Sequence, residues 1–289
     1  LHAVAARGPP RAALAGIELR VLRKTNVNVK KVACWDEGLR RVLEGQRVEN
    51  PYALIDALTY GFEGDNVACW EVFDESRLEA VVYRYYDGLQ VVFCGQAGHR
   101  AIRAVATLVE KMDPSMVQTS YSAAAELATV LADYSLSEGW VMRADGTQVP
   151  DPAAVRATEA DYPEIARLIC GDEEIGKHYD VGALVAQLCE RERLQGCRSI
   201  VIRDSEGIAA HMATYAESDD VAVCGGLKAR PGAEKGVGAR VLSSLAVEVA
   251  ARGLIPLLYC YIEPLWPWYE AHGWEKAFHV AKLEHCGNN

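Results

Sequence analysis

The chain has 289 residues, of which 50% are hydrophobic and 24% are charged, which is enough for one large domain or two of ordinary size. Its formal net charge of -10 excludes a long-range basic field for nucleic acid or an anionic membrane, while a local basic patch for a phosphorylated ligand stays compatible with it. No apolar run approaches the roughly 18–20 residues that span a bilayer. We therefore expect neither a nucleic-acid partner nor a membrane partner.

Cysteine usage points to the compartment. The nine cysteines are scattered, with no Cys-x-x-Cys pair, and most have apolar neighbours. An odd number at irregular spacing is typical of reduced, buried thiols in a cytoplasmic protein rather than of a disulfide framework. These spacings give no support to a zinc site, so we expect no metal.

The first half of the chain predicts helices separated by a run of strands. Residues 1–16 are rich in alanine and lack the continuous apolar core of a signal peptide, so we expect a loose leader there. Asn50 as N-cap, Pro51 at the first helical position and Gly61 at the end predict a clear helix over 51–61. Period-two patterning and helical periodicity predict the remaining elements: a helix at 35–44, strands at 68–74, 78–86 and 89–94, a helix at 100–112, a strand at 117–121, a helix at 122–134 and a strand at 140–143.

A linker is expected at 144–154, because two prolines, two aspartates and a glycine interrupt the pattern there. We place a domain boundary after residue 150. The second half then predicts a helix at 158–170, with Thr158 or Asp161 as N-cap. The further expected elements are a helix at 181–193, strands at 199–203, 208–217 and 221–229, a helix at 237–252, a strand at 256–262, a short helix at 264–272 and one or two strands at 274–283.

The stretch DDVAVCGGLKARPGAEKGVGARVL, residues 219–242, carries the most chemical information. An apolar strand broken by Gly225-Gly226 leads through a turn to Lys235-Gly236-Val237-Gly238, which opens a helix. Bare N–H groups at a helix start, with glycines that permit close approach, form an anion site. The spacing is neither that of a Walker loop nor that of a dinucleotide fingerprint.

The order of these elements, together with three motifs, resembles the GNAT acetyltransferase superfamily over about residues 155–284. The motifs are the Lys235-Gly236-Val237-Gly238 helix start, the strand 257–262 that follows this helix, and the ending Trp268-Tyr269-Glu270-Ala271-His272-Gly273-Trp274. The first half repeats the same order more faintly, with Gly95-Gln96-Ala97-Gly98 in place of the GxG. The resemblance therefore implies an α/β (α+β) fold with a tandem arrangement. A degenerate GNAT-like domain would occupy residues 17–150 and an acetyltransferase domain residues 151–289, each a mostly antiparallel mixed sheet flanked by helices.

The resemblance also implies acetyl-CoA as cosubstrate and an amine of a small molecule as acceptor. The coenzyme would bind to Leu227 and Ala229 along the strand and to Lys235, Gly236, Val237, Gly238 and Ala239 around the turn. Two departures from the family pattern concern the residues that hold the coenzyme. Ala233 stands where the family usually has Arg or Gln, with Glu234 adding a negative charge beside it, and Ile262 replaces the family's common Asn at the end of the penultimate strand, seven residues before Tyr269. Lys228, Arg230 and Lys235 supply positive charge that offsets Glu234.

Acetyl transfer needs an acid for the leaving thiolate and a base for the amine. Tyr269 is the candidate acid, and it reads alternatively as a core residue. Glu217 is the first candidate base, with His211 as another; each also reads as a structural residue of its strand. Cys224 reads better as a small buried hydrophobe than as a nucleophile. Four aromatic residues cluster near the end of the chain and either line an acceptor pocket or belong to the core. They are Tyr259, Tyr261, Trp266 and Trp268.

Two other hypotheses remain open at this point. A GNAT fold that no longer catalyses would bind or sense acyl-CoA, and Ala233, Glu234 and Ile262 motivate that reading. A nucleotide-binding α/β protein would use the GxG for a different phosphate, but the antiparallel hairpins before the GxG argue against it. Net negative charge favours a cationic amine as acceptor, and a homodimer is left open.

Overall fold

The computed structural model describes residues 27–171 and 180–288. Among these residues, contacts divide the chain into two compact units. We call residues 27–140 with 278–288 the N-terminal half, and the described part of 141–277 the C-terminal half. This division differs from the expected boundary at 150, because residues 141–150 pack in the C-terminal half while the last strand ends in the N-terminal half. The leader expected at 1–16 lies outside the described residues.

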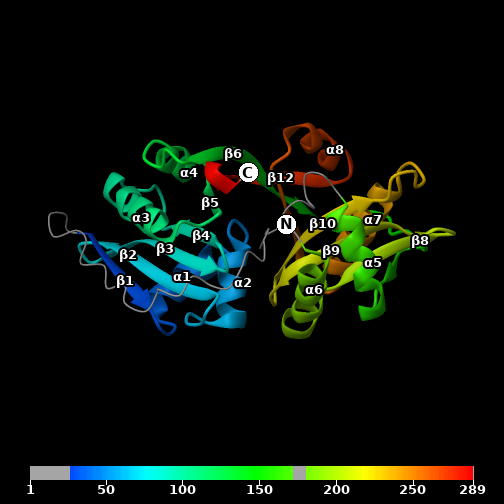
Figure 1. Cartoon of the computed structure of the whole chain (residues 1–289), viewed down its shortest axis with the longest axis horizontal. Helices are drawn as coiled ribbons and strands as arrows, with labels where there is room; N and C mark the ends of the chain where they lie inside the picture. The colour runs from blue at the N-terminus through cyan, green and yellow to red at the C-terminus, as the bar shows by residue number, and fades with distance from the viewer. Residues whose placement is uncertain (1–26, 172–179, 289) are drawn as a thin grey trace. The chain divides into compact units, whose positions relative to one another are not determined.

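After β1, which was not predicted from the sequence, the N-terminal half follows the expected order of helices and strands (Figure 1). Its elements are β1 (Val27–Val32), α1 (Glu37–Gly45), α2 (Pro51–Tyr60), β2 (Val67–Asp74), β3 (Arg77–Tyr85), β4 (Gly88–Phe93), α3 (His99–Met112), β5 (Met116–Ser120), α4 (Tyr121–Ala128) and β6 (Tyr134–Ala144), with the end of β12 (Trp274–His285). Asn50 stands at the N-cap position of α2, as expected, although its side chain makes no capping hydrogen bond and its amide donates to Gln46 Oε1. One local expectation was wrong. Helix α4 ends at Ala128, and β6 begins at Tyr134, within the span expected to be helical.

The strands of the N-terminal half lie in the order β1-β2-β3-β4-β5-β12. The pairs β1–β2, β2–β3, β3–β4 and β5–β12 are antiparallel, whereas β4 and β5 are parallel from Gly88↔Met116 to Gln90↔Gln118. One face of the sheet packs on α3 and α4 in an apolar core that includes Trp70, Val82 and Leu108. The other face meets the α1–α2 side, where Tyr83 Oη donates to the carbonyl oxygen of Gly61, the residue that ends α2.

The C-terminal half has the same plan. Its elements are the end of β6, β7 (Val155–Arg156), a 3-10 turn (Glu159–Asp161), α5 (Tyr162–Cys170), α6 (Val181–Gln195), β8 (Ser199–Asp204), β9 (Gly207–Glu217), β10 (Val221–Ala229), α7 (Val237–Ala251), β11 (Ile255–Cys260), a 3-10 turn (Glu263–Leu265), α8 (Trp266–Ala271) and the start of β12. Thr158 and Asp161 form a capping box before α5, in agreement with the sequence.

The strands of the C-terminal half lie in the order β6-β11-β10-β9-β8-β7. Strands β8, β9 and β10 are antiparallel, and β10 and β11 are parallel, which requires a crossover connection that α7 provides. Helices α5 and α6 cover one face of these strands and α7 covers the other (Figure 1). The apolar stripe of α7 is buried against the sheet, with Val241, Leu242, Leu245 and Val249 among its contacts.

The segment expected to be a linker is fixed to α7. Gly146 has a φ of 73°, and a Cβ atom on it would overlap the Cβ of Ala250. The Asp151 carboxylate forms an ion pair with Arg240, and the backbone N–H of Asp151 donates to Ser244 Oγ at 2.9 Å. These contacts make residues 144–154 part of the C-terminal half rather than a spacer.

Strands β6 and β12 each contribute to both halves. Residues 278–285 of β12 belong to the N-terminal half, where Val280 to Glu284 pair with β5. Residues 141–144 of β6 belong to the C-terminal half. Side chains connect the two strands within each half: Ser137 Oγ lies 3.3 Å from Glu284 Oε2 in the N-terminal half, and Arg143 pairs with Glu275 in the C-terminal half.

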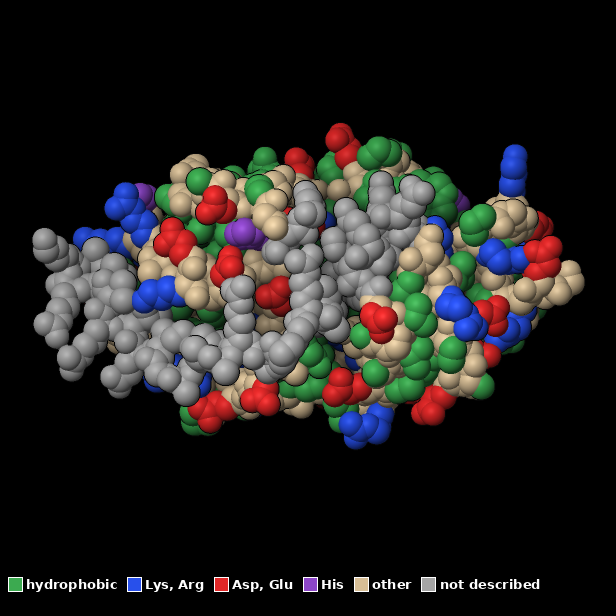
Figure 2. Space-filling model, in the orientation of Figure 1, with side chains coloured by type: hydrophobic (Ala, Val, Ile, Leu, Met, Phe, Trp, Pro, Cys, Tyr) green, Lys and Arg blue, Asp and Glu red, His purple; other side chains and the backbone are tan. Residues whose placement is uncertain are grey.

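The nine cysteines all lie among the described residues and are free thiols. The fully buried ones are Cys69, Cys197, Cys224 and Cys260, so fewer are buried than expected. Within the described ranges, no helix is long and apolar enough to span a membrane, and no group of three His, Cys, Asp or Glu side chains could hold a metal. On the face drawn in Figure 2, basic and acidic side chains are interspersed.

Candidate functional site

The site begins where the parallel ladder between β10 and β11 stops. Pairing runs from Val221↔Ile255 to Cys224↔Leu258, although β10 continues to Ala229 and β11 to Cys260. We call residues 225–229 of β10 and 259–260 of β11 the ladder opening. Within the described residues, the ladder between β10 and β11 contains no pair beyond Cys224↔Leu258, so an extended ligand can pair with this edge of β10.

A bulge in β10 marks the start of the ladder opening. The register against β9 shifts between Gly225↔Ala213 and Lys228↔His211, so β10 has one more residue than β9 over this interval. Gly226 has a φ of 64°, in the left-handed region that favours glycine. Tyr215 packs on both glycines: a Cβ on Gly225 would lie 3.3 Å from its ring, and one on Gly226 would overlap its hydroxyl. The break expected at Gly225-Gly226 is therefore present, and glycine is required there.

Backbone direction places two amides on the open edge. The N–H of Arg230 donates to Ala209 O of β9 at 2.8 Å. Because successive N–H groups of a strand point to opposite sides, the N–H groups of Ala229 and Leu227 point away from β9, toward the ladder opening. The resemblance to GNAT proteins implied contact of these same two residues with the coenzyme, and that contact stays a prediction.

The glycine turn follows directly. Gly236 has a φ of 87° and occupies the N-cap position of α7, without a side-chain cap. A Cβ atom on Gly236 or Gly238 would meet no heavy atom within 4 Å. The first N–H groups of α7 have no partner within the helix, so Gly238 and Ala239 present donors beside open space. Lys235, Gly236, Val237, Gly238 and Ala239 thus form one cradle, with only the Val237 side chain buried.

The arginines near this cradle are already ion-paired. Arg230 pairs with Asp204, at 2.5 Å, and with Glu206. Arg240 pairs with Asp151 and, at 2.7 Å, with Glu234. In the described part of the chain the exposed Lys235 has no ion pair, so its ammonium is available to an anion on the turn.

Tyr269 lies on α8, near the end of β11. Its side chain is 9% exposed, and burial raises the pKa of its phenol, with a smaller contribution from the nearby Cys260 thiol. A raised pKa keeps the phenol protonated, which is the state a proton donor needs. Cys260 is the last residue of β11, and Trp266 of α8 donates to its carbonyl oxygen at 3.1 Å, so the helix that carries Tyr269 is attached beside the ladder opening.

The aromatic residues around α8 are half-buried, which separates them from the apolar core. Tyr259 and Tyr261 stack with ring centroids 6.3 Å apart, and Trp268 meets Tyr269 edge to face at 5.1 Å. Trp266 Nε1 donates to Cys260 O at 3.1 Å, which ties α8 to the end of β11. This arrangement can form a wall beside the opening.

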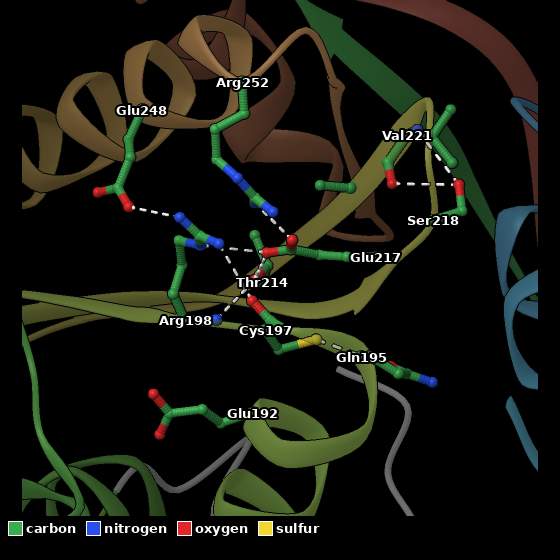
Figure 3. Close-up of polar contacts among 12 residues, drawn as sticks. Glu192, Gln195, Cys197, Arg198, Thr214, Glu217, Ser218, Val221, Glu248 and Arg252 are labelled. Carbon is green, nitrogen blue, oxygen red and sulfur yellow. Dashed lines mark hydrogen bonds and ion pairs between the residues drawn. The ribbon is translucent and has the colours of Figure 1, made fainter.

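Glu217 lies away from these groups, in an ion-pair cluster at the other end of α7 (Figure 3). Its carboxylate accepts from Thr214 Oγ1 at 2.6 Å and pairs with Arg198 at 3.4 Å and Arg252 at 2.5 Å. Arg252 caps the C-terminal end of α7, whose 15 residues separate it from the glycine turn by about 22 Å. The structure therefore does not bring Glu217 to the site, and its interpretation as the general base is replaced by a structural one.

His211 and Cys224 lie at the edge of the opening but are buried. His211 Nδ1 lies 3.0 Å from Gly226 O, and burial lowers the pKa of the imidazole to about 4. Burial raises the pKa of the Cys224 thiol, so the thiol stays protonated, in line with the structural reading of this residue. Sequence reasoning missed Tyr215 and Arg240: the double glycine hints at a side chain packed above it, but no sequence signal links Arg240 to Asp151.

Comparisons with known proteins support this fold. No family model matches the chain, and no curated protein does either. Among solved structures, a GCN5-related N-acetyltransferase from Sphaerobacter thermophilus superposes with a TM-score of 0.61 at 16% identity, covering 89% of this chain and 95% of that one. A tandem GNAT protein from the clavulanic acid biosynthesis pathway gives 0.54 at 12% identity, covering 91% and 99%. A GNAT-family acetyltransferase from Colwellia psychrerythraea gives 0.55 at 13% identity, covering 89% and 99%.

Proposed function

We propose that this chain, whose halves together have the tandem GNAT fold, is an acyl-CoA-dependent N-acetyltransferase. It moves an acetyl group from acetyl-CoA to an amine of a small molecule by direct attack in a ternary complex. The observation that carries the proposal is the continuity of donors in the C-terminal half. The open-edge amides of Leu227 and Ala229 lead directly to the glycine cradle at the start of α7.

The residues present fit acetyl-CoA through their backbone. An extended pantetheine arm can pair with the open edge of β10, and a pyrophosphate can bind the N–H groups of Gly238 and Ala239, where glycines leave space. Lys235 adds one positive charge that no carboxylate of the described chain neutralises. When bound, the coenzyme supplies a thioester, which is an acetyl group open to attack by an amine.

The chain then positions the two reactants and handles one proton. The amine nitrogen forms a bond to the acetyl carbon as the carbon–sulfur bond breaks, and the proton that the amine loses passes to solvent. Tyr269, kept protonated by burial, donates its proton to the leaving thiolate and regains one from solvent. Holding both reactants in line with N–H groups aimed at the carbonyl oxygen supports the tetrahedral intermediate.

A second candidate function is acyl-CoA binding or sensing without turnover. It is favoured by the placement of the two candidate bases, because Glu217 is ion-paired at the other end of α7 and His211 is buried with its Nδ1 hydrogen-bonded to Gly226. In that case the cradle would still bind the coenzyme, and Tyr269 would have no chemical role.

Binding is tested by the melting temperature with acetyl-CoA at roughly 100 times its dissociation constant, where the expected stabilisation is about 2.7 kcal/mol. For a protein of this size the shift is about 5–10 °C. Gly236→Asp should abolish it, because a carboxylate would enter the cradle. Gly253→Asp is the matched control, since Gly253 also has a left-handed φ of 81° and open space but follows the other end of α7.

Turnover is tested by thiol release across a panel of amines. Loss of turnover in Tyr269→Phe with binding retained supports the enzyme, and binding without turnover by the wild type supports the sensor. A wild-type protein that is not stabilised by acetyl-CoA or coenzyme A contradicts both functions.

A further inference from the structure

The environment of His211 contains a contact that the reaction above does not use. The imidazole is wholly buried on β9, and its Nδ1 lies 3.0 Å from the carbonyl oxygen of Gly226. A carbonyl oxygen can only accept, so Nδ1 carries the hydrogen. Nε2 then keeps its lone pair, and among the described residues it has no hydrogen-bond partner. The neutral ring acts toward Gly226 as a single donor.

This donor compensates for the bulge. At Gly226 the register between β10 and β9 shifts, so the Gly226 carbonyl loses the regular ladder partner that a flat strand would provide. A buried carbonyl without a partner is costly, and the His211 side chain supplies the missing N–H. The contact therefore fixes the direction of one carbonyl at the start of the ladder opening.

Fixing this carbonyl also fixes the next amide. The carbonyl of Gly226 and the N–H of Leu227 belong to one planar peptide group, and in a trans peptide they point in opposite directions. A carbonyl held toward β9 by His211 thus turns the Leu227 N–H away from β9. That is the open edge on which the Arg230–Ala209 hydrogen bond also places it.

We propose that His211 is a positioning residue that aims the Leu227 N–H into the ladder opening, where the acyl-pantetheine arm accepts it. This role rests on the proposed function. It replaces the interpretation of His211 as a general base: the useful atom is Nδ1, through its hydrogen, and not the lone pair of Nε2.

The two roles predict opposite results for isosteric variants. Asn places an amide N–H near the position of Nδ1, whereas Gln places one near Nε2 and Leu places none. His211→Asn should retain kcat/KM for acetyl-CoA within about 3-fold. His211→Leu and His211→Gln should lose about 100-fold, the scale expected for a misplaced reactant. Equal losses in His211→Asn and His211→Leu would overturn the positioning role, because a base is removed in both.

A control variant separates the loss of the His211–Gly226 hydrogen bond from a general disturbance of the packing around Gly226. Tyr215→Phe removes another buried polar atom beside Gly226 but leaves the His211 contact, so its kcat/KM should differ from that of His211→Leu. Melting temperatures of all variants show which are folded at the assay temperature. A Tyr215→Phe loss as large as that of His211→Leu, with both folded, would overturn the assignment to Nδ1.

A measurement without ligand tests the contact itself. In ¹⁵N-histidine NMR spectra of the free protein, His211 should show a protonated Nδ1 and an unprotonated Nε2, and amide exchange at Leu227 should change in His211→Leu but not in His211→Asn. A protonated Nε2 at neutral pH would overturn the proposal. If the tautomer is as expected but the wild type neither binds nor turns over acetyl-CoA, the proposed function fails and the catalytic part of this inference fails with it.

Discussion

Glu234 Oε2 lies 2.7 Å from Nη1 of Arg240, so the carboxylate in the glycine turn is paired with a guanidinium from the first turns of α7. The sequence places the negative charge of Glu234 beside the expected pyrophosphate, with Lys228, Arg230 and Lys235 as the residues that would offset it. The structure gives that role to Arg240, which also pairs with Asp151. The cost to anion binding is thereby reduced, because part of the repulsion is cancelled before a ligand arrives.

Replacing Glu234 with Gln should tighten coenzyme A binding. The change removes a negative charge from the turn and releases Nη1 of Arg240, whose guanidinium stays oriented by Asp151. Between exposed groups such a charge contributes about 0.5–1 kcal/mol, which corresponds to roughly a 2- to 5-fold lower dissociation constant at low salt. Isothermal titration at low and high salt measures it, and the gain should shrink at high salt.

Glu159→Gln is the matched control for this charge change. Glu159 lies in the 3-10 turn before α5, on a surface pocket that α6 lines with Cys189 and Glu190. Its substitution should leave the dissociation constant of coenzyme A unchanged. An equal gain in both variants would show that only net charge matters, and no gain in Glu234→Gln would contradict binding of the pyrophosphate at the turn.

Replacing Glu217 with Gln should destabilise the fold without impairing the chemistry of the molecules that remain folded. The carboxylate is buried, and it pairs with the Arg198 guanidinium, which is only 12% exposed and also pairs with Glu248 at 3.0 Å. Because Arg198 keeps Glu248 as a partner, the expected loss is below the roughly 3–5 kcal/mol of a buried pair whose remaining charge is left alone, and we expect about 1–3 kcal/mol for the lost charged hydrogen bonds. Urea unfolding should show that loss, whereas kcat measured well below the melting temperature should stay within about 3-fold of wild type. A loss of kcat with unchanged stability would restore Glu217 as the base.

Much of the C-terminal half could be predicted because its signals are local. Strand 221–229 has the bounds expected from its apolar run, and α7 starts at Val237, just after the left-handed Gly236. The resemblance to GNAT proteins is confirmed for the fold by the solved structures. The assignment of Leu227, Ala229 and the turn to the coenzyme stays a prediction, since it concerns a ligand.

The errors come from contacts between residues far apart in sequence. Pro and Gly in 144–154 predict a linker, and nothing in that stretch shows that Asp151 reaches Arg240 or that Gly146 lies against Ala250. Glu217 is the last residue of β9 and lies near the glycine motif in sequence. Its register opposite Ala222, which pairs with Pro256, places it four residues before Cys260 along the sheet, about 13 Å by strand rise. Likewise, nothing in the sequence of 274–285 indicates that the end of β12 pairs with β5 in the N-terminal half.

His211 should make stability depend on pH. The folded-state pKa is lowered to about 4 from an ordinary value near 6.5, so the unfolded chain binds a proton that the folded chain rejects as the pH falls below about 6.5. The contribution of His211 to the free energy of unfolding is fully present above about pH 6.5 and is lost as the pH falls toward 4. Between pH 7.5 and 5 the loss should be about 2 kcal/mol.

The check is the difference between wild type and His211→Asn in the free energy of unfolding, measured by urea titration at each pH. Subtraction removes the background titration of the carboxylates, which is common to both proteins. The difference should diminish as the pH falls from 7.5 to 5. A constant difference would mean that the imidazole can be protonated in the folded state, contrary to its burial and its hydrogen bond to Gly226.

Replacing Gly146 with Ala should be among the most destabilising small changes in the C-terminal half. The φ of 73° disfavours any side chain, and the new methyl group would overlap the Cβ of Ala250 on α7. Left-handed strain of about 1 kcal/mol and overpacking of about 1–3 kcal/mol add, so the expected loss is about 2–4 kcal/mol. Gly253→Ala provides the comparison, because Gly253 has a φ of 81° and open space, so strain alone acts there. Chemical unfolding of both variants measures the difference. Equal losses would show that residues 144–154 move freely away from α7, in which case the original reading of this stretch as a linker would be correct.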